Sequence, residues 1–309
     1  MENIEVIDNP RCREIKRNIA RDFCSNEIGF KLNQKRILLI HSVPFEFTFS
    51  SQEISNWVEK LLPSALHQPN QQVLKEKPIQ VAWLDVRLLT SKSLGNWTND
   101  ADPELESFEY EGKEVAIQRD FLGFLSPNKA TIYCYPGLDD SLYNALRWLL
   151  PRYLLEKQML MLHSSCMVGS SNRASVFLGP SGAGKTTTVS RLKERLILGD
   201  DMIMVSVEKG RAYAESAALG QNPKFQGPIG QKFPIDGFYF LNKGKVVAKK
   251  PSPQLVATRK FFSSILYPTW KTTDQIDQII SLSQVFLHLV SAWELTLDTK
   301  TPFLGLVDG

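Results

Sequence analysis

The feature that most constrains this sequence is the glycine-rich run GPSGAGKT, which begins at Gly179 and satisfies the pattern GxxxxGK[ST] at every position. The apolar segment 174–178 before it predicts a buried strand, and the segment 185–196 after it predicts a helix. In such a strand, loop and helix, glycines allow backbone N–H groups to surround a phosphate, and the positive end of the helix adds to the attraction. The sequence therefore predicts a site for a nucleoside triphosphate.

The loop also predicts which residues contact the nucleotide and its metal. Lys185 is expected to reach the outer phosphates, and the hydroxyl of Thr186 is expected to bind Mg²⁺. We therefore expect ATP and Mg²⁺ as cofactors. The nucleotide contacts are assigned to the loop and the first residues of the helix, namely Gly179, Pro180, Ser181, Gly182, Ala183, Gly184, Lys185, Thr186 and Thr187.

Two adjacent aspartates, Asp200 and Asp201, follow the loop after only one predicted helix and one short strand at 196–198. A connection of this length is expected to return the chain beside the strand that precedes the loop, which would place both carboxyls next to the phosphates. One carboxylate can then hold Mg²⁺ while the other accepts a proton from an attacking hydroxyl. We assign Thr186 and Asp201 to the metal, but the sequence leaves open which aspartate is the base.

A purely structural role is the alternative for these residues. Asp-Asp pairs are commonly polar turns, as we expect for Asp139 and Asp140. His163 ends the apolar run MLMLH, one predicted hairpin upstream of the loop. If this run pairs with segment 174–178, His163 approaches the phosphates or an aspartate, although a histidine on a strand is often only a structural hydrogen-bonding residue. The candidate catalytic residues are His163, Lys185, Asp200 and Asp201.

The spacing of apolar and turn-forming residues predicts an α/β fold in two domains. Residues 1–137 are expected to form an α+β domain that recognises the substrate, and residues 138–309 a P-loop catalytic domain with a mixed sheet and flanking helices. Predicted helices lie at 50–66, 139–158, 252–267 and 272–290, and predicted strands at 36–43, 45–49, 79–86 and 293–297. Predicted hairpins lie at 107–125, turning at Glu111-Gly112, at 202–216, and at 237–250, turning at Asn242–Gly244.

The charge and composition of the chain limit its partners. The net charge is only +3 in 309 residues and the basic residues are spread out, so neither nucleic acid nor a membrane is expected as a partner. The four cysteines show no spacing typical of zinc sites or disulfide frameworks. The most apolar window, 279–297, is interrupted by polar residues and predicts an amphipathic helix followed by a strand, and the charged N-terminus is unlike a signal peptide. We expect a cytoplasmic protein.

Together these motifs, LHSSCMV…ASVFLGPSGAGKTTTVSRL…LILGDD, resemble the HPr kinase/phosphorylase superfamily, and in particular the HPr-kinase-related proteins. The resemblance runs from about residue 150 to the C-terminus. It implies an HPr-kinase-like fold and a kinase that transfers the γ-phosphate of ATP to a serine-type hydroxyl of a protein or peptide, a short precursor peptide included. The positions that match the family pattern are His163, Gly179, Ser181, Gly182, Gly184, Lys185, Thr186, Asp200 and Asp201.

The chain departs from this family in one motif, and other functions share the same pattern. Related kinases often carry a Pro-aromatic-x-Gly-Glu segment, whereas the run LGQNPKFQGPIG found here has no acidic residue, and Glu215 is the nearest upstream candidate. ATP-dependent phosphoenolpyruvate carboxykinases share the arrangement GxSGxGKTT…GDD. The open alternatives are therefore a small-molecule kinase, an enzyme of the carboxykinase type and a nucleotide-dependent binding module without transferase activity. HPr kinases are hexamers, and only this resemblance points to a homo-oligomer.

Overall fold

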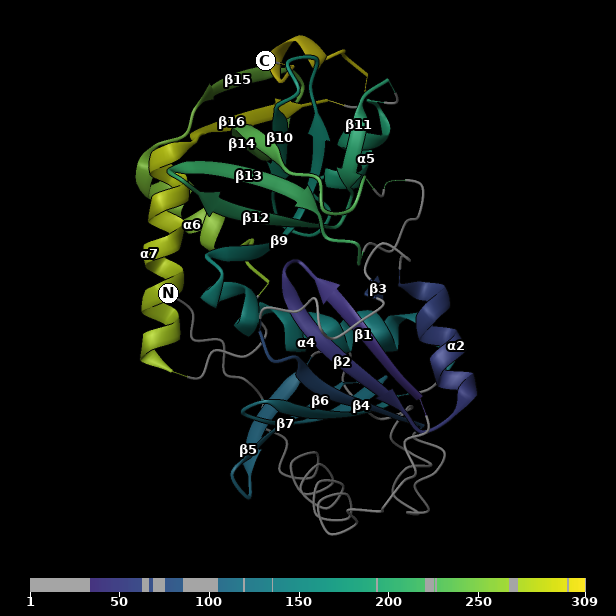
Figure 1. Cartoon of the computed structure of the whole chain (residues 1–309). Helices are drawn as coiled ribbons and strands as arrows, with labels where there is room; N and C mark the ends of the chain where they lie inside the picture. The colour runs from purple at the N-terminus through teal and green to yellow at the C-terminus, as the bar shows by residue number, and fades with distance from the viewer. Residues whose placement is uncertain are drawn as a thin grey trace, which may run out of the picture. The chain divides into compact units, whose positions relative to one another are not determined.

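The computed structural model divides the chain into two compact units, residues 1–148 and residues 149–309, whose elements are labelled in Figure 1. The division falls inside helix α4 (Asp139–Glu156), which continues through Pro151, whereas the sequence placed a domain boundary after residue 137. The structure describes residues 34–62, 67–68, 76–85, 105–118, 120–134, 136–192, 194–219, 225, 227–266, 272–298 and 300–308. All other residues, including Cys12, Cys24 and the whole of segment 86–104, lie outside this description.

The first unit contains an eight-stranded mixed sheet. Helix α2 (Gln52–Leu61) begins after Ser51, whose hydroxyl accepts a hydrogen bond from the Ile54 amide. The turn between β5 and β6 has positive φ at both Glu111 and Gly112, which confirms the predicted hairpin turn. The strands follow the order β3-β1-β2-β4-β8-β7-β6-β5. They are β1 (Gln34–Ile40), β2 (Val43–Phe49), β3 (His67–Gln68), β4 (Ile79–Asp85), β5 (Glu106–Tyr110), β6 (Lys113–Gln118), β7 (Phe121–Ser126) and β8 (Lys129–Cys134).

The second unit contains the sheet that carries the glycine-rich loop. The strands follow the order β10-β9-β12-β13-β14-β16-β15, and β11 pairs with β9 beside β12. Since β14 also pairs with β10, the strands from β9 to β14 close into a ring. The strands are β9 (Met159–Val168), β10 (Ala174–Leu178), β11 (Leu196–Gly199), β12 (Met202–Glu208), β13 (Arg211–Ser216), β14 (Phe233–Lys243), β15 (Ala248–Pro251) and β16 (Ser291–Leu297). The helices are α5 (Lys185–Ser190), α6 (Gln254–Phe262), α7 (Thr273–Leu289) and the 3₁₀ helix η6 (Leu304–Leu306).

Both faces of β10 are buried, which fixes the strand that leads into the loop. Val176 and Leu178 face a core that includes Phe261 of α6 and Phe286 of α7. Phe177, between them in sequence, faces a second core with α5 and the C-terminal segment around η6. Alternation of this kind follows from the two-residue period of a strand, and burial on both faces explains why this strand reads as a continuous apolar run. The loop therefore starts from a strand held between two cores.

Several predicted elements are confirmed. β9 and β10 pair across a short turn, β12 and β13 form a hairpin, and the apolar window 279–297 forms the end of α7 followed by β16. The structure as a whole is mixed α/β, with mixed sheets in both units. Among the described helices, none has the length and apolar character needed to cross a lipid bilayer.

Three local predictions are wrong. Segment 237–250 is not a hairpin, because β16 lies between β14 and β15 and pairs with both. The helix predicted over 185–196 ends at Ser190, where the next residue, Arg191, donates side-chain hydrogen bonds to the carbonyls of Asp298 and Thr301. The Asp139-Asp140 pair is not a turn between elements but the first turn of α4, where carboxylates interact favourably with the helix dipole.

Phe261→Ala should destabilise the second unit by about 3–5 kcal/mol, because its ring is fully buried and packs edge-on against the ring of Phe238, with centroids 4.9 Å apart. Urea unfolding followed by circular dichroism measures the change in the free energy of unfolding. The matched control on the same helix is Leu255→Ala, because Leu255 is 83% exposed and its loss should change that free energy by less than about 0.5 kcal/mol. Equal effects of the two substitutions would contradict the packing of α6.

Candidate functional site

The glycine-rich loop joins the end of β10 to α5 in a shape that favours glycine. Gly182 and Gly184 have φ values of +75° and +99°, in the left-handed region that L side chains rarely adopt. A Cβ on Gly179 would lie 2.8 Å from the Cβ of Ala183, so the loop folds closely onto itself. The backbone N–H groups of Gly182 and Gly184 donate no hydrogen bond to any described residue. They are therefore available to an anion.

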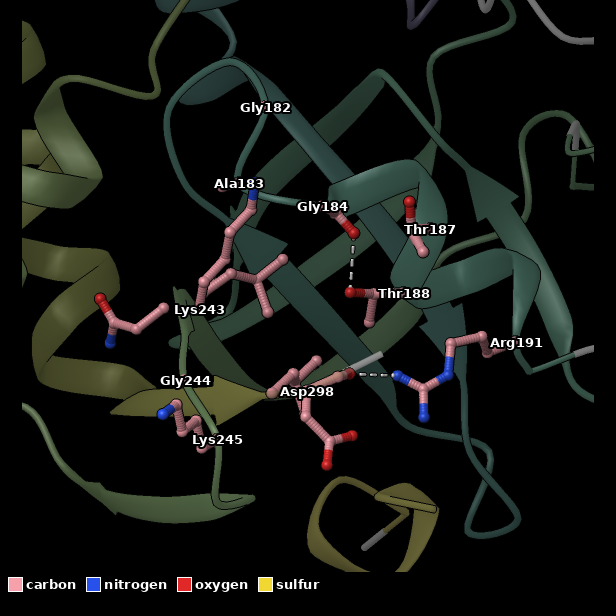
Figure 2. A pocket seen from close by; sticks show the side chains of 13 residues that line it. Gly182, Ala183, Gly184, Thr187, Thr188, Arg191, Lys243, Gly244, Lys245 and Asp298 are labelled. Carbon is pink, nitrogen blue, oxygen red and sulfur yellow. Dashed lines mark hydrogen bonds between the residues drawn. The ribbon is translucent and has the colours of Figure 1, made fainter. Parts of the chain in front are cut away.

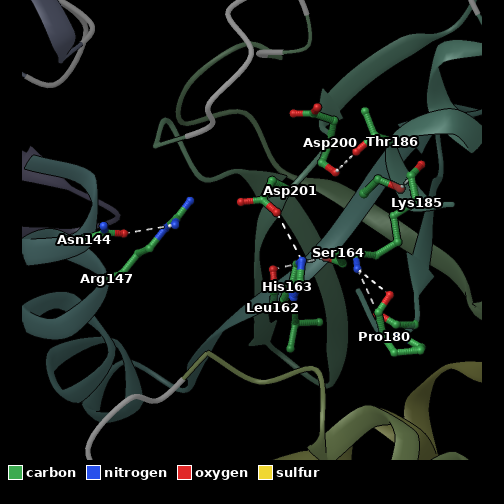
Figure 3. A network of polar contacts seen from close by, with 12 residues as sticks. Asn144, Arg147, Leu162, His163, Ser164, Pro180, Lys185, Thr186, Asp200 and Asp201 are labelled. Atoms are coloured by element: carbon green, nitrogen blue, oxygen red, sulfur yellow. Dashed lines mark hydrogen bonds and ion pairs between the residues drawn. The ribbon is translucent and has the colours of Figure 1, made fainter. Parts of the chain in front are cut away.

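Lys185 is folded back against the loop. Its Nζ donates hydrogen bonds to the carbonyl oxygens of Gly179 and Pro180 at 2.9 and 3.2 Å (Figure 3). Burial lowers the pKa of Lys185, and the negative charge of Asp201 opposes this shift. The two carbonyls are neutral partners, so phosphate oxygens entering the loop would offer this ammonium stronger, charge-assisted hydrogen bonds.

Pairing with β9 places the two aspartates at the same edge of the sheet as the loop. β11 and β12 pair with β9 one after the other, on the edge opposite β10, and Asp200 and Asp201 lie between them. The Ser164 amide donates to the carbonyl of Asp201 at 3.0 Å, and Ser164 also faces Leu178 at the end of β10. The prediction that the chain returns beside β10 is wrong, because β9 lies between β10 and β11. The two strands nevertheless run parallel, so their C-terminal ends lie at the same edge.

Asp200 is more buried than Asp201. The residue is 7% exposed, and its Oδ1 has no hydrogen-bond partner among the described residues. Burial raises the pKa of this carboxyl, and the neighbouring charge of Asp201 raises it further. Because an ionised carboxylate without a partner is costly to bury, this oxygen is suited to receive a proton or to face a cation.

The oxygen atoms around Asp201 fit a hard divalent cation. The hydroxyl of Thr186 donates to the carbonyl of Asp200 at 3.3 Å, which leaves the hydroxyl's own lone pairs for a cation. The side chain of Asp201 is 29% exposed and so remains accessible. Mg²⁺ is usually held by one or two carboxylates together with phosphate oxygens of the substrate. Thr186 and Asp201 therefore fit Mg²⁺ as long as a nucleotide supplies the remaining ligands.

His163 lies within β9 rather than at the end of a strand, opposite Met202 of β12. Its Nε2 is 3.2 Å from Oδ1 of Asp201 (Figure 3). Its backbone N–H donates to the carbonyl of Ser264, just after α6, at 2.7 Å. The predicted pairing of β9 with β10 is thus present and brings the imidazole to an aspartate. The sheet and the end of α6 together set the position of this residue.

The tip of the loop separates two pockets. We call the first, of about 570 Å³, the α5-side pocket; it is lined by Thr187 of α5 and Arg191 just after that helix, and by Lys243 at the end of β14 and Lys245 in the turn that follows (Figure 2). We call the second, of about 810 Å³, the α6-side pocket; it is lined by His163, the start of the loop and the C-terminal half of α6. A nucleotide and a second substrate can therefore approach the loop from different directions.

The structure brings together the sequence-predicted residues of the loop, both aspartates and His163. Sequence reasoning missed the basic residues that the end of β14, the turn after it and α6 contribute to the pocket walls: Lys243, Lys245, Arg259 and Lys260. The turn had been assigned to a hairpin and the Arg-Lys pair to an ordinary helix. The only signal in the sequence was the recurrence of basic residues downstream of a phosphate loop, which does not show where their side chains lie.

Glu215 is buried in β13, opposite Met204 of β12, and its carboxylate lies 3.8 Å from Nζ of Lys232. Residues 220–224 and 226, in the run that lacks an acidic residue, lie outside the described part of the chain.

Part of the chain is similar to phosphoenolpyruvate carboxykinases. A family model described as phosphoenolpyruvate carboxykinase matches residues 137–216, a stretch that contains His163, the loop and both aspartates. The ATP-dependent enzymes of Pelobacter propionicus and Geobacter metallireducens are 41% and 43% identical over 68 residues, which are 22% of this chain and 12% of each enzyme. An enzyme of Urochloa panicoides is 35% identical over 93 residues, 28% of this chain and 14% of its own. The chain thus spans less than a seventh of the length of these relatives.

One solved structure comes from the family that the motifs resemble. The HPr(Ser) kinase/phosphatase from Coxiella burnetii has a TM-score of 0.25 and 12% identity, and the match covers 47% of this chain and 87% of that one. A score at this level does not establish a shared fold. The second unit is therefore assigned only to the mixed α/β class.

Asp200→Asn should stabilise the protein at neutral pH in the absence of nucleotide and metal. Since the folded state raises the pKa of Asp200, it binds this proton more tightly than the unfolded chain does, and stability is lost as the pH rises through the raised pKa. The neutral amide removes that loss. The gain should therefore be present at about pH 7.5 and shrink as the pH falls toward the ordinary aspartate value, about 3.9.

Thermal unfolding in EDTA across this pH range measures the effect of Asp200→Asn. Asp274→Asn, at an exposed position in the first turn of α7, is a control that makes the same chemical change and should give no such gain. An Asp200→Asn variant less stable than the natural protein at neutral pH would show that the protein itself satisfies the carboxylate.

Proposed function

We propose that this chain is an ATP- and Mg²⁺-dependent phosphotransferase that transfers the γ-phosphate to a hydroxyl, with serine in a protein or peptide as the acceptor. The observation that carries the proposal is the convergence of Lys185, Asp200 and Asp201 at the edge where β10 and β11 end. A phosphate loop alone is compatible with simple nucleotide binding, whereas paired carboxylates beside it supply what phosphoryl transfer needs. The carboxykinase match supports the use of ATP, and the resemblance of the motifs to HPr-kinase-related proteins supports the hydroxyl acceptor.

In this proposal the loop and Lys185 bind the triphosphate and hold its outer phosphate in place. The amides of Gly182 and Gly184 donate to phosphate oxygens, and Lys185 exchanges the carbonyls of Gly179 and Pro180 for them. Mg²⁺, held by Thr186 and Asp201, neutralises phosphate charge when bound. Most of the catalytic effect would then come from positioning and charge neutralisation.

Asp200 is the proposed proton acceptor. A bond forms between the acceptor oxygen and the γ-phosphorus while the bond from that phosphorus to the β–γ bridging oxygen breaks, so ADP leaves and the hydroxyl proton passes to Asp200. The buried Oδ1 of Asp200 without a partner favours this role. His163, 3.2 Å from Asp201, positions that neighbouring carboxylate rather than taking part in the transfer.

A second candidate function is an enzyme of the phosphoenolpyruvate carboxykinase type, favoured by the relatives and by the family match over residues 137–216. The same loop and carboxylates would then serve a different acceptor, an enolate oxygen. The family match ends before β14 and α6 begin, so it does not extend to the parts of the two pocket walls that these elements supply. The acceptor therefore has to be decided by experiment.

The decisive experiment tests the full chain in two separate reactions. In one, γ-labelled ATP and Mg²⁺ are incubated with a cell lysate, and label on protein or peptide is expected. In the other, phosphoenolpyruvate, bicarbonate and ADP are supplied, and ATP formation would identify the carboxykinase type. Tight nucleotide binding without either reaction would leave a binding module.

Asp200→Asn should lower the rate of label transfer by about 100-fold or more, because an amide cannot accept the proton, while ATP affinity stays within about threefold. Asp201→Asn should instead raise the Mg²⁺ concentration needed for half-maximal transfer. Asp274→Asn serves as the control for the loss of one carboxylate at an exposed position. Near-normal transfer by both site variants would overturn the paired-carboxylate mechanism.

A further inference from the structure

The wall of the α6-side pocket carries basic side chains without matching acidic ones. Arg259 and Lys260 of α6 and Lys243 line it, and none of the described residues that line it is acidic. Lys260 already has a carboxylate partner, because its Nζ lies 3.2 Å from Glu294 of β16. Arg259 is exposed, and its guanidinium has no hydrogen bond or ion pair to any described residue. Arg259 is therefore a cation of this pocket that is left for a ligand.

Helix α6 is fixed on the sheet next to His163, so the place of Arg259 is well determined. Phe261 packs in the core, and the carbonyl of Ser264 accepts the hydrogen bond from the His163 amide. The hydroxyl of Ser263 donates to the carbonyl of Arg259 at 2.9 Å. Arg259 thus lies one helical turn from the end of α6 that contacts His163, a rise of about 6 Å along the helix axis.

The geometry assigns Arg259 to the acceptor rather than to the nucleotide. Lys243 lines both pockets and can serve either ligand, whereas Arg259 lines only the pocket that contains His163. His163 in turn contacts Asp201, one of the two carboxylates beside the loop. The acceptor hydroxyl has to reach those carboxylates, so it enters by the α6-side pocket, and the nucleoside takes the α5-side pocket.

The exposed face of α6 extends away from the pocket. Its side chains are spaced at about the interval of alternate residues in an extended peptide. Ser263, Arg259 and Leu255 follow each other at intervals of four residues, which places them on one face of the helix at steps of about 6 Å. Leu255 is 83% exposed. Alternate residues of an extended chain are about 6.6 Å apart and point the same way, so every second residue of such a chain would meet one of these positions.

We propose that the acceptor is an extended peptide segment with an acidic side chain two residues from the phosphorylated serine, and that Arg259 binds this carboxylate. An apolar side chain four residues from the serine, on the same side, would lie at Leu255. This inference rests on the proposed function and names its substrate class. Arg259 suits the task because its planar guanidinium binds a carboxylate through two parallel hydrogen bonds.

A set of synthetic peptides tests the inference on the full chain. Each peptide has a single serine and carries Glu, Gln or Lys two residues before or after it, and the rate of labelling from γ-labelled ATP is measured. The natural chain should label the Glu peptide of one of the two arrangements about tenfold faster than its Gln counterpart, the effect of one charge-assisted hydrogen bond. Arg259→Glu should remove this preference and make the Lys peptide the better substrate, while ATP affinity is unchanged.

The control Lys245→Glu makes the same type of charge reversal in the α5-side pocket and should weaken ATP binding while the preference for the Glu peptide remains. Equal labelling of Glu, Gln and Lys peptides would overturn the inference and leave the proposed function standing. Failure to label any peptide, with ATP still bound, would overturn it as well. Failure of the natural chain to bind ATP would instead reject the proposed function.

Discussion

Hydrogen bonds along both edges of β9 set the distance between the phosphate loop and the aspartates. On one edge β9 pairs with β10, which leads into the loop, and on the other with β11 and β12, which flank Asp200 and Asp201. Neighbouring strands lie about 4.8 Å apart, so the loop strand and the aspartate strand are separated by about 10 Å. The lysine of the loop and the carboxylates therefore follow strands that lie on opposite edges of β9, at a separation that this pairing sets. A shift of β9 by one residue would turn His163 to the opposite face and remove its contact with Asp201.

Among the described residues, Asp200 and Lys185 lack the hydrogen-bonded partner of opposite charge that several other charged residues of the second unit have. Elsewhere Glu294 binds Lys260 and Asp308 binds Arg195, and hydrogen bonds from these cations lower the pKa of both carboxyls. At the site, by contrast, burial raises the pKa of Asp200, and Lys185 bonds only to neutral carbonyls. This arrangement costs the free protein some stability. A ligand offsets the cost when it supplies phosphate charge to Lys185 and a proton or a cation to Asp200. The electrostatics therefore indicate a site built for a bound substrate.

The part of this site that sequence reasoning predicted is the part made by neighbouring residues. The strand, loop and first helical turn follow one another along the chain, and their residue types follow directly from the backbone shape that a phosphate requires. The missed features depend on pairing between distant segments. Nothing in the local spacing of 237–250 shows that β16 separates β14 from β15, and nothing around Asp200 shows that β9 lies between the aspartates and the loop strand. Arg259 is another feature that depends on distant segments, because its place beside the loop results from the packing of α6.

The contrast between residues that are close in sequence and residues brought in by packing also explains how similarity to other proteins relates to function here. The stretch matched by the carboxykinase family, residues 137–216, contains the loop, the aspartates and His163, which are the residues that the proposed function assigns to phosphate binding and transfer. The remaining parts of the two pocket walls include residues of β14, the turn after it and α6, all beyond residue 216. Phosphate chemistry can therefore be shared while the acceptor differs, since function depends on the residues that surround a site as well as on the motif within it. In the proposal made above, the acceptor would be selected by residues on α6, where Arg259, which has no hydrogen bond or ion pair to any described residue, lines the pocket that also contains His163.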